Sequence, residues 1–242
     1  MKRKSIIEIK EFKIKGNVLL KETKISIKEK SWTCLLGASG CGKTSLLKYI
    51  SGINSNISFN GSITGFIDEK KCMYMDQKPG LLPWRNILSN IGISSLLYGE
   101  EIDIKKIEII LESLSLNKSI KNKYPEELSL GMQQRVSLAR TIYMNRDIIL
   151  LDEPFSALDA ITKKESQDFT KNNLSEKTVI LVTHDIIEAM ILSNTIYVFR
   201  PSTMSFEGPF EINEDNKIKK DIEYIMDNKR DIYKKLISII NG

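Results

Sequence analysis

The stretch from Trp32 to Ser45 constrains the fold of this chain more than any other. It reads WTCLLGASGCGKTS, a short apolar run followed by a glycine-rich turn, and a helical pattern starts at Leu46. We expect a β-strand, a tight loop and a helix N-terminus. Glycines let successive backbone N–H groups point inward around an anion, and the helix adds the positive end of its dipole. The spacing G-x-x-x-x-G-K-T therefore predicts a P-loop that binds a nucleoside triphosphate.

Each part of this loop has an expected role. Lys43 supplies a mobile positive charge for the outer phosphates, and the Thr44 hydroxyl is placed to ligate Mg²⁺. The residues expected to hold the nucleotide are Gly37, Ala38, Ser39, Gly40, Cys41, Gly42, Lys43, Thr44 and Ser45. The alternative is a glycine-rich structural turn with an exposed lysine. We favour the nucleotide site.

Length and charge limit the remaining possibilities. The 242 residues suffice for one large domain or a core with a subdomain, and are too few for two NTPase modules. Lys and Arg number 36 against 31 Asp and Glu, a net charge of +5, and the basic residues are scattered, so nucleic acid is not predicted. Apolar runs such as Ile148–Leu151 are far shorter than the roughly 20 residues of a membrane span. The basic start, Met1–Ser5, precedes no apolar signal core. We expect a soluble protein that stays where it is made.

The three cysteines show no disulfide or metal pattern. Cys34, Cys41 and Cys72 have no metal-ligand spacing and cannot all pair. We therefore expect free thiols in a reducing compartment.

Strand periodicity dominates the region around the P-loop. Ile6–Ile14 and Lys24–Lys28 alternate apolar and polar residues, which predicts half-buried antiparallel strands. Asn54–Gly65 carries apolar residues at strand spacing and is interpreted as a further hairpin. Cys72–Gln77 predicts a short strand that ends in a polar pair. Together these segments indicate an antiparallel β subdomain at the N-terminus.

Helical periodicity follows. A loop with two prolines, Lys78–Trp84, leads into a helical pattern over Arg85–Ser115 that breaks near Tyr98-Gly99. A second helical block begins after Glu127 and runs to Asn145. These segments predict an inserted α-helical subdomain.

The C-terminal third alternates strands and helices. Ile148–Pro154 is an unbroken apolar run ending in two carboxylates, as expected of a parallel strand buried on both faces. A helix over Ala160–Asn173 and a strand over Thr178–Val182 follow, then a further helix after Asp185. This order predicts an α/β fold with a mixed, mostly parallel sheet whose site lies at the strand C-termini.

The end of the chain is expected to close this sheet. Ile196–Phe199 and Met204–Phe206 look like a hairpin. The tail from Asn216 carries apolar residues at helical spacing, which predicts an amphipathic helix packed on the body.

Polar residues at strand ends supply candidates for phosphate chemistry. Hydrolysis of a γ-phosphate needs a phosphate cradle, a metal and a group that orients or deprotonates water. Asp152 suits the metal shell. Glu153 points to the other side of the strand and can face the attacking water, although adjacent carboxylates can also cap a helix. The Gln77 amide can reach Mg²⁺ or the water. His184, the single histidine, follows the next strand, where a structural role is the alternative.

Residues 128–140, LSLGMQQRVSLAR, resemble the LSGGQ-x-QR signature of ABC transporter ATPases. In the same resemblance Gln77 is the Q-loop, Asp152-Glu153 is Walker B, Ser156–Asp159 is the D-loop and His184 is the switch histidine. With the P-loop these six elements keep the order and spacing of the family over about residues 6–208. The resemblance implies a P-loop NTPase core that uses ATP and Mg²⁺. It implies catalytic roles for Glu153, His184, Gln77 and Lys43, and magnesium ligation by Thr44, Gln77 and Asp152.

The resemblance also predicts how the chain is divided. Residues 1–242 would form a single ABC ATPase domain. About 1–77 and 146–208 would make the core, 78–145 the helical signature subdomain and 209–242 a C-terminal helical tail.

The signature predicts a partner copy. Ser129 and the backbone N–H groups around Gly131 open a helix and form a second anion-binding N-terminus. The resemblance implies that Ser129, Gly131 and Met132 face ATP held by another copy, in a head-to-tail homodimer that the Asp159 loop crosses. ATP would close this dimer and hydrolysis would reopen it. The motion would drive import through membrane permease subunits at the cytoplasmic face of the membrane, with a solute-binding protein upstream.

Two features depart from the family pattern. Leu130 replaces the first glycine of the signature and Met132 its glutamine, so Leu130 adds bulk where backbone approaches phosphate. The family stacks an aromatic ring on adenine about two dozen residues before the P-loop. That position holds Ile14 in ungapped register, so adenine rests either on an aliphatic face or, with a small gap, on Phe12.

The loop Gln77–Asn90, QKPGLLPWRNILSN, bears on the cargo. It resembles that of importers of nitrate, sulfonate, taurine and thiamine precursors. Exposed Leu81, Leu82 and Trp84 would form an apolar patch where a permease coupling helix docks, unless Trp84 is buried subdomain core.

Other classes of protein share part of this motif pattern. An export or lipoprotein-release ATPase is the first alternative. A non-transport ABC ATPase of DNA repair or translation is disfavoured because only 50 residues separate Gln77 from Leu128, too few for a long insertion. A P-loop kinase is excluded mainly by the signature and His184.

Overall fold

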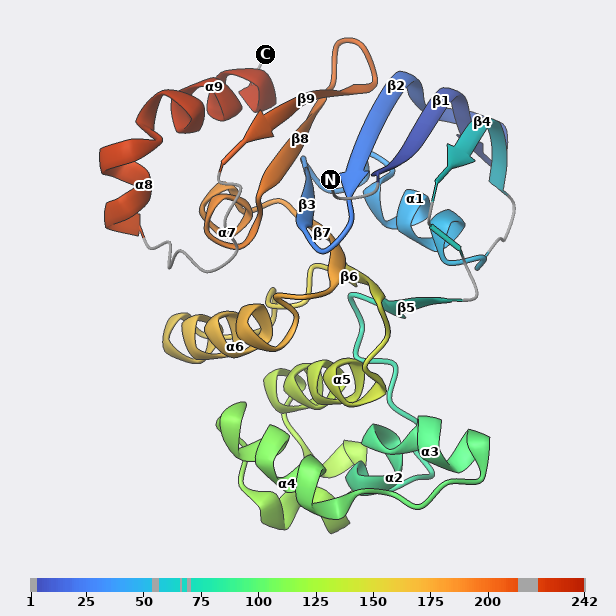
Figure 1. Cartoon of the computed structure of the whole chain (residues 1–242), viewed down its shortest axis with the longest axis vertical. Helices are drawn as coiled ribbons and strands as arrows, with labels where there is room; N and C mark the ends of the chain where they lie inside the picture. The colour runs from blue at the N-terminus through green and yellow to red at the C-terminus, as the bar shows by residue number, and fades with distance from the viewer. Residues whose placement is uncertain (1–3, 54–56, 66, 69–70, 213–221, 242) are drawn as a thin grey trace. The chain divides into compact units, whose positions relative to one another are not determined.

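The computed structural model describes residues 4–53, 57–65, 67–68, 71–212 and 222–241, and its chain forms two compact units (Figure 1). The first, called the core unit here, comprises residues 1–74, 147–152 and 175–242. The second, called the helical unit, comprises residues 75–146 and 153–174. Residues 153–174, which the sequence assigned to the core, group with the helical unit, and the tail 209–242 groups with the core unit.

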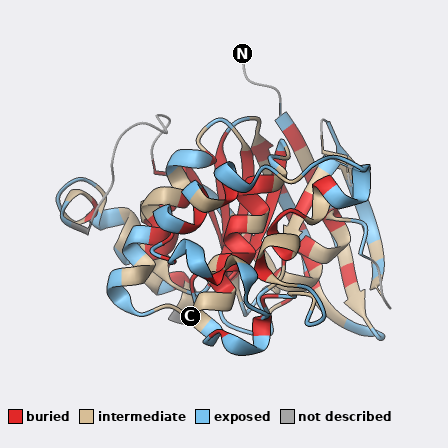
Figure 2. Cartoon of the chain, turned by 90° about the horizontal axis from the view of Figure 1, so that it is seen from below, coloured by how far each residue is buried: buried red, intermediate tan, exposed pale blue. Residues whose placement is uncertain are grey.

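A six-stranded sheet forms the centre of the core unit, in the order β5-β6-β7-β3-β8-β9. Its strands are β3 (Trp32–Leu36), β5 (Cys72–Met75), β6 (Ile148–Asp152), β7 (Thr178–Thr183), β8 (Thr195–Arg200) and β9 (Ser205–Glu211). β6, β7, β3 and β8 are mutually parallel, and β9 closes the edge antiparallel to β8. Every residue of β3, β6 and β7 is buried (Figure 2), as expected of parallel strands covered on both faces. The predicted parallel sheet and closing hairpin are confirmed.

Helices of the core unit cover this sheet. α1 (Lys43–Ile50) packs against β6 and β7, and α7 (Ile186–Leu192) packs against β3 and β7. Because α1 starts directly after the glycine-rich loop, its packing fixes the N-terminal end of the helix beside the ends of the parallel strands.

A second, antiparallel sheet has the order β2-β1-β4, made by β1 (Lys4–Ile14), β2 (Asn17–Lys28) and β4 (Ile57–Thr64). The predicted N-terminal β subdomain is therefore confirmed, but the hairpin predicted over 54–65 is wrong. β4 is one strand, paired with β1 throughout, and residues 54–56 lie outside the described residues. Asn60-Gly61 has the sequence of a turn, yet Gly61 serves close strand approach, since a Cβ there would lie 2.0 Å from the Glu8 carbonyl oxygen.

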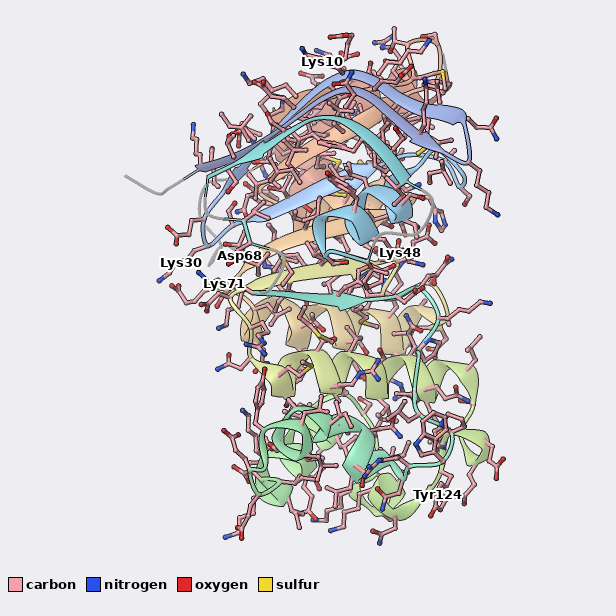
Figure 3. The ribbon with its side chains drawn as sticks, turned by 90° about the vertical axis from the view of Figure 1, so that its right-hand side faces the viewer. Lys10, Lys30, Lys48, Asp68, Lys71 and Tyr124 are labelled. Carbon is pink, nitrogen blue, oxygen red and sulfur yellow. The ribbon has the colours of Figure 1, made fainter. Side chains whose placement is uncertain are left out.

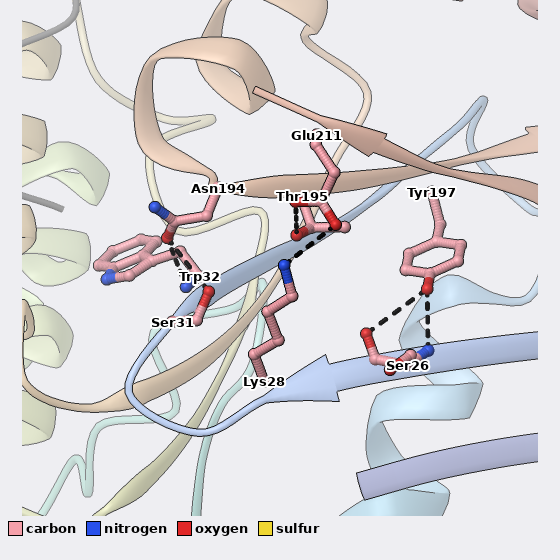
Figure 4. A network of polar contacts seen from close by, with 8 residues as sticks. All are labelled: Ser26, Lys28, Ser31, Trp32, Asn194, Thr195, Tyr197 and Glu211. Carbon is pink, nitrogen blue, oxygen red and sulfur yellow. Dashed lines mark hydrogen bonds and ion pairs between the residues drawn. The ribbon is translucent and has the colours of Figure 1, made fainter. Parts of the chain in front are cut away.

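Side chains tie the two sheets of the core unit together (Figure 4). The Tyr197 hydroxyl on β8 accepts a hydrogen bond from the Ser26 amide of β2 at 2.9 Å. Within the six-stranded sheet, Asn194 just before β8 accepts from the Trp32 amide of β3 at 2.9 Å. Lys28 pairs with Glu211 of β9 at 3.2 Å. Burial raises the pKa of the Tyr197 hydroxyl, which stays protonated.

The C-terminal tail forms two helices, α8 (Ile222–Asn228) and α9 (Arg230–Asn241). α9 packs against β8 and α7 and buries Leu236 and Ile239, as its amphipathic pattern predicts. The predicted start at Asn216 lies outside the described residues. The tail also begins later than residue 209, because β9 continues to Glu211.

The helical unit contains α2 (Ile87–Ile91), α3 (Ile93–Tyr98), α4 (Ile104–Ser113), α5 (Leu130–Met144) and α6 (Ala160–Asn173). α5 packs against α2, α4 and α6. The predicted break falls at Gly99, whose φ of 71° ends α3. A further break at Gly92 separates α2 from α3. None of the described helices reaches the length and apolarity that a membrane span requires.

Candidate nucleotide site

The glycine-rich loop joins β3 to α1 with the geometry that its sequence predicts. Gly40 and Gly42 have φ values of 84° and 98°, a conformation that favours glycine. Gly37 also has no room for a side chain, because a Cβ would lie 2.8 Å from Phe199 Cβ, and a Cβ at Gly42 would lie tightly against Leu19 Cβ at 3.2 Å. The loop is therefore held close to its neighbours with its backbone free of side-chain cover.

Lys43 is folded back against this loop. Its side chain is only 4% exposed, and its ammonium donates hydrogen bonds to the carbonyl oxygens of Gly37 and Ala38, both at 2.7 Å. This buried ammonium donates to neutral carbonyl oxygens. Phosphate oxygens are charged and accept stronger hydrogen bonds, so a bound phosphate can replace the carbonyl groups as its partners. Burial raises the pKa of the neighbouring Cys41 thiol against the opposing effect of Lys43, so this thiol stays protonated.

Hard oxygen donors meet at the end of β6. The fully buried Asp152 carboxylate accepts hydrogen bonds from the Thr44 hydroxyl at 3.0 Å and the Tyr74 hydroxyl at 3.1 Å. Such oxygens suit Mg²⁺, which keeps several waters and binds through one or two protein ligands plus phosphate. In the described part of the chain no cluster of three or more His, Cys, Asp or Glu residues could hold a metal alone. The donor set thus fits an ion shared with a bound phosphate.

Glu153 and Gln77 lie together in the helical unit. The Glu153 backbone is left-handed, with a φ of 45°, and its side chain is 8% exposed. The Gln77 amide donates to its carboxylate at 3.3 Å. A left-handed glutamate costs about 1–2 kcal/mol, and such strain gathers at functional sites. The two residues expected to handle water are therefore within hydrogen-bonding reach of each other.

His184 directly follows β7, as predicted. β7 runs parallel to β3, with Thr183 paired to Leu36, and the Gly37 amide donates to the Thr183 carbonyl oxygen at 3.3 Å. The histidine is exposed, and Asp185 next to it caps α7 through the Glu188 amide at 3.1 Å. His184 and the glycine-rich loop therefore leave neighbouring strand ends on the same side of the sheet.

The signature opens α5 with capped geometry. The Ser129 hydroxyl accepts from the Met132 amide at 3.3 Å, and the Leu130 side chain is 61% exposed. A Cβ at Gly131 would lie 3.2 Å from the Ala157 carbonyl oxygen, so the signature touches the loop that precedes α6. Asp159 caps α6 by accepting from the Thr162 amide at 3.1 Å, which holds the pKa of this carboxyl below its usual value.

The contacts of Tyr74 in the core unit and of Arg140 in the helical unit were not predicted. Arg140 on α5 donates to the carbonyl oxygens of Pro79 and Gly80, each at 2.9 Å, and so fixes the loop after Gln77 to the signature helix. Burial lowers the pKa of Arg140, which still carries its charge. The sequence signal for Tyr74 is its alternation with Met73 and Met75 in β5, whereas Arg140 differs in no local way from other arginines on helices.

The assignment of Phe12 to the adenine base is wrong. Its side chain is fully buried, and its ring lies edge-on to Tyr49 and Phe59 with centroid distances of 6.1 and 6.2 Å. A ring in this position is core packing and presents no face to a base. Ile14 is half-buried at the end of β1, and adenine contact with its aliphatic side chain stays a prediction.

A glycine-rich phosphate cradle, a buried lysine and a Thr–Asp pair at the ends of parallel strands define a P-loop nucleotide-binding protein. The family described as ABC transporter matches residues 20–156 of the chain. The chain therefore belongs to the ABC transporter family, as its signature motif predicted, and it is an ATP-binding, ATP-hydrolysing cassette.

Several relatives agree. An uncharacterised ABC transporter ATP-binding protein of Haemophilus influenzae is 38% identical over 76% of this chain and 77% of its own length. The aliphatic sulfonates import ATP-binding protein SsuB 2 of Pseudomonas syringae pv. tomato is 37% identical, with coverage of 80% and 82%. The corresponding protein of Bacillus subtilis is also 37% identical, with coverage of 76% and 73%.

Solved structures show the same fold. A dimeric ATP-binding cassette in a post-hydrolysis state, bound to ADP and phosphate, superposes with a TM-score of 0.74 at 25% identity. The match covers 86% of this chain and 99% of that one.

Proposed function

We propose that the chain is the ATPase subunit of an importer, acting as a head-to-tail homodimer that ATP closes and hydrolysis reopens. The proposed dimer is supported chiefly by the exposed start of α5. There the Ser129 cap and the Gly131 backbone form a helix N-terminus suited to an anion. Similar cassettes have been solved as dimers, which supports the same assembly here.

The residues of one copy have separate roles in binding and hydrolysing ATP. The loop amides from Gly37 to Gly42 and the Lys43 ammonium hold the phosphates. Thr44, Asp152 and Gln77 are the proposed ligands of Mg²⁺, which when bound neutralises charge developing on the phosphates. Glu153 accepts a proton from the attacking water, with Gln77 and His184 orienting the water and the terminal phosphate. Ser129, Gly131 and Met132 of the second copy complete the site, and the Asp159 loop crosses the interface.

Partner subunits are proposed from the apolar surface of the helical unit. Of the large apolar side chains that are exposed in the described residues, all but Ile53 belong to this unit, and Trp84 is 72% exposed. Exposed apolar groups of this kind mark interaction sites. We assign Trp84, with half-buried Leu81 and Leu82 beside it, to docking with a membrane permease. The permease would hold the ATPase at the cytoplasmic face of the membrane, with a solute-binding protein delivering cargo.

The proposed cargo is a small solute of the nitrate, sulfonate, taurine and thiamine-precursor group. Relatives named for aliphatic sulfonate import support sulfonates first. Inside-out membrane vesicles carrying the chain, its permease and the solute-binding protein should release a labelled alkanesulfonate from the lumen to the bath in an ATP-dependent manner. ATP-dependent accumulation in the lumen of the same vesicles would identify an exporter and overturn the proposal.

Replacing Trp84 with alanine is expected to reduce recovery of the permease complex at least about tenfold, because the truncation removes a large exposed anchor of the kind that dominates interfaces. ATP binding should stay unchanged. Co-purification with the tagged permease measures the first property and nucleotide titration the second. Tyr124→Ala is the matched control, since Tyr124 is an exposed aromatic residue of the same unit outside this loop (Figure 3). Undiminished assembly of the Trp84 variant would rule out the docking role.

Replacing Leu130 with glycine is expected to tighten ATP-dependent dimerisation several-fold and to raise turnover. The exposed leucine adds bulk where the signature backbone approaches the phosphate of the other copy, while the glycine costs about 1 kcal/mol of helix stability. Sedimentation with ATP and steady-state phosphate release report the two effects. A variant that dimerises more weakly than wild type would show that Leu130 contributes a favourable contact instead.

A further inference from the structure

The contact between α5 and α6 is unusual in its chemistry. α6 packs against α5, and its buried side chains are all polar, namely Ser166, Gln167 and Thr170. On α5, Gln134 is 1% exposed and lies one turn after Gly131 on the same face. Since Gly131 faces the Ala157 carbonyl just before α6, the Gln134 face of α5 is the one directed toward α6.

The polar groups on these two faces are not bonded to each other. Both amide atoms of Gln134, the Ser166 hydroxyl and the Thr170 hydroxyl are buried and have no hydrogen-bond partner. Thr141, equally buried on α5, differs, because its hydroxyl donates to the Ser137 carbonyl oxygen at 3.0 Å. On α5 and α6 the buried amide and hydroxyl groups without a partner are therefore those of Gln134, Ser166 and Thr170, and the one further such polar atom on these helices is Arg140 Nε.

The unpaired groups are chemically matched. A glutamine amide carries two donors and one acceptor oxygen, and each hydroxyl can both donate and accept. A buried polar group without a partner destabilises the state that contains it. An arrangement of the two helices in which these groups met would remove that penalty, so the present register is disfavoured relative to one that pairs them.

We infer that α5 and α6 possess a second register, in which the Gln134 amide bonds to Ser166 or Thr170. ATP bound at the Ser129 end of α5 stabilises this second register. Gln134 is then a positioning residue, because it sets the signature relative to the Asp159 loop without touching nucleotide. The inference rests on the proposed homodimer. The unpaired groups destabilise the present register and so reduce the free-energy difference between the two registers. ATP shifts the equilibrium to the second register by binding that register more tightly.

Two isosteric variants test the inference. Thr170→Val removes an unpaired hydroxyl and Gln134→Leu an unpaired amide, whereas the control Thr141→Val removes a bonded hydroxyl. We expect the first two to raise the melting temperature of the nucleotide-free protein by roughly 2–4 °C each. We expect them to raise the ATP concentration for half-maximal dimerisation about tenfold while leaving ATP affinity of the monomer unchanged. Thr141→Val should not stabilise the protein or alter dimerisation. Thr170→Ser should restore wild-type dimerisation.

Each contrary result has a distinct meaning. Lower melting temperatures for Thr170→Val and Gln134→Leu would show that these groups are bonded in solution, for example by buried water, and would overturn the inference. Higher melting temperatures with unchanged dimerisation would overturn the coupling to ATP. A wild-type protein that does not dimerise with ATP would overturn the homodimer itself. That failure is recognisable because the melting temperatures of the nucleotide-free variants do not depend on it.

Discussion

Replacing Glu153 with glutamine is expected to lower steady-state ATP hydrolysis at least about 100-fold while ATP-dependent dimerisation persists. The amide is nearly the same shape as the carboxylate, and its oxygen can still accept the hydrogen bond that Gln77 donates to Glu153. The left-handed backbone is unaffected, because the two side chains branch alike. What disappears is the group that takes a proton from water. Phosphate release and sedimentation with ATP measure the two properties separately.

The matched control is Glu165→Gln on α6. Glu165 is exposed, and its carboxylate accepts from the Ser115 hydroxyl at 2.6 Å. It lies in the same unit but in no part of the proposed site, so turnover should stay within about twofold of wild type. Wild-type turnover in Glu153→Gln would remove the general-base assignment. Loss of both turnover and dimerisation would instead show that the Glu153 charge is needed to form the site.

Replacing Lys43 with methionine is expected to weaken ATP binding about 100-fold or more. The methionine keeps the apolar stem in its buried position, whereas the ammonium that now bridges the Gly37 and Ala38 carbonyl oxygens is lost. Those oxygens would then face the phosphates with no positive charge between them. Calorimetric titration with a non-hydrolysable ATP analogue gives the affinity, and circular dichroism verifies folding.

Lys48→Met is the control for that experiment. Lys48 lies in the last turn of the same helix, α1, with its ammonium 5.9 Å from the centroid of the Tyr74 ring (Figure 3). Its removal should leave affinity for the analogue within about threefold of wild type. Equal losses in the two variants would show that general positive charge on α1, rather than the position of Lys43, attracts the nucleotide.

Local sequence determined much of this protein. Glycines at Gly37, Gly40 and Gly42 stand where the loop needs positive φ or close approach, and this need is visible in the residue type alone. The Ser129 and Asp159 caps follow from short-range preferences that act within one helical turn. The unbroken apolar run Ile148–Leu151 predicts a strand buried on both faces, and this pattern can be recognised without knowing which strands pair with it.

Tertiary packing decided the rest. Phe12 follows strand alternation whether it lines a base site or the core, and its place in the core, edge-on to Tyr49 and Phe59, depends on tertiary packing. Arg140 meets carbonyl groups about 60 residues away in sequence. The polar faces of α5 and α6 look like ordinary solvated positions until the two helices pack. Spacing along a chain encodes backbone conformation, but which groups are left without partners depends on where distant segments come to rest.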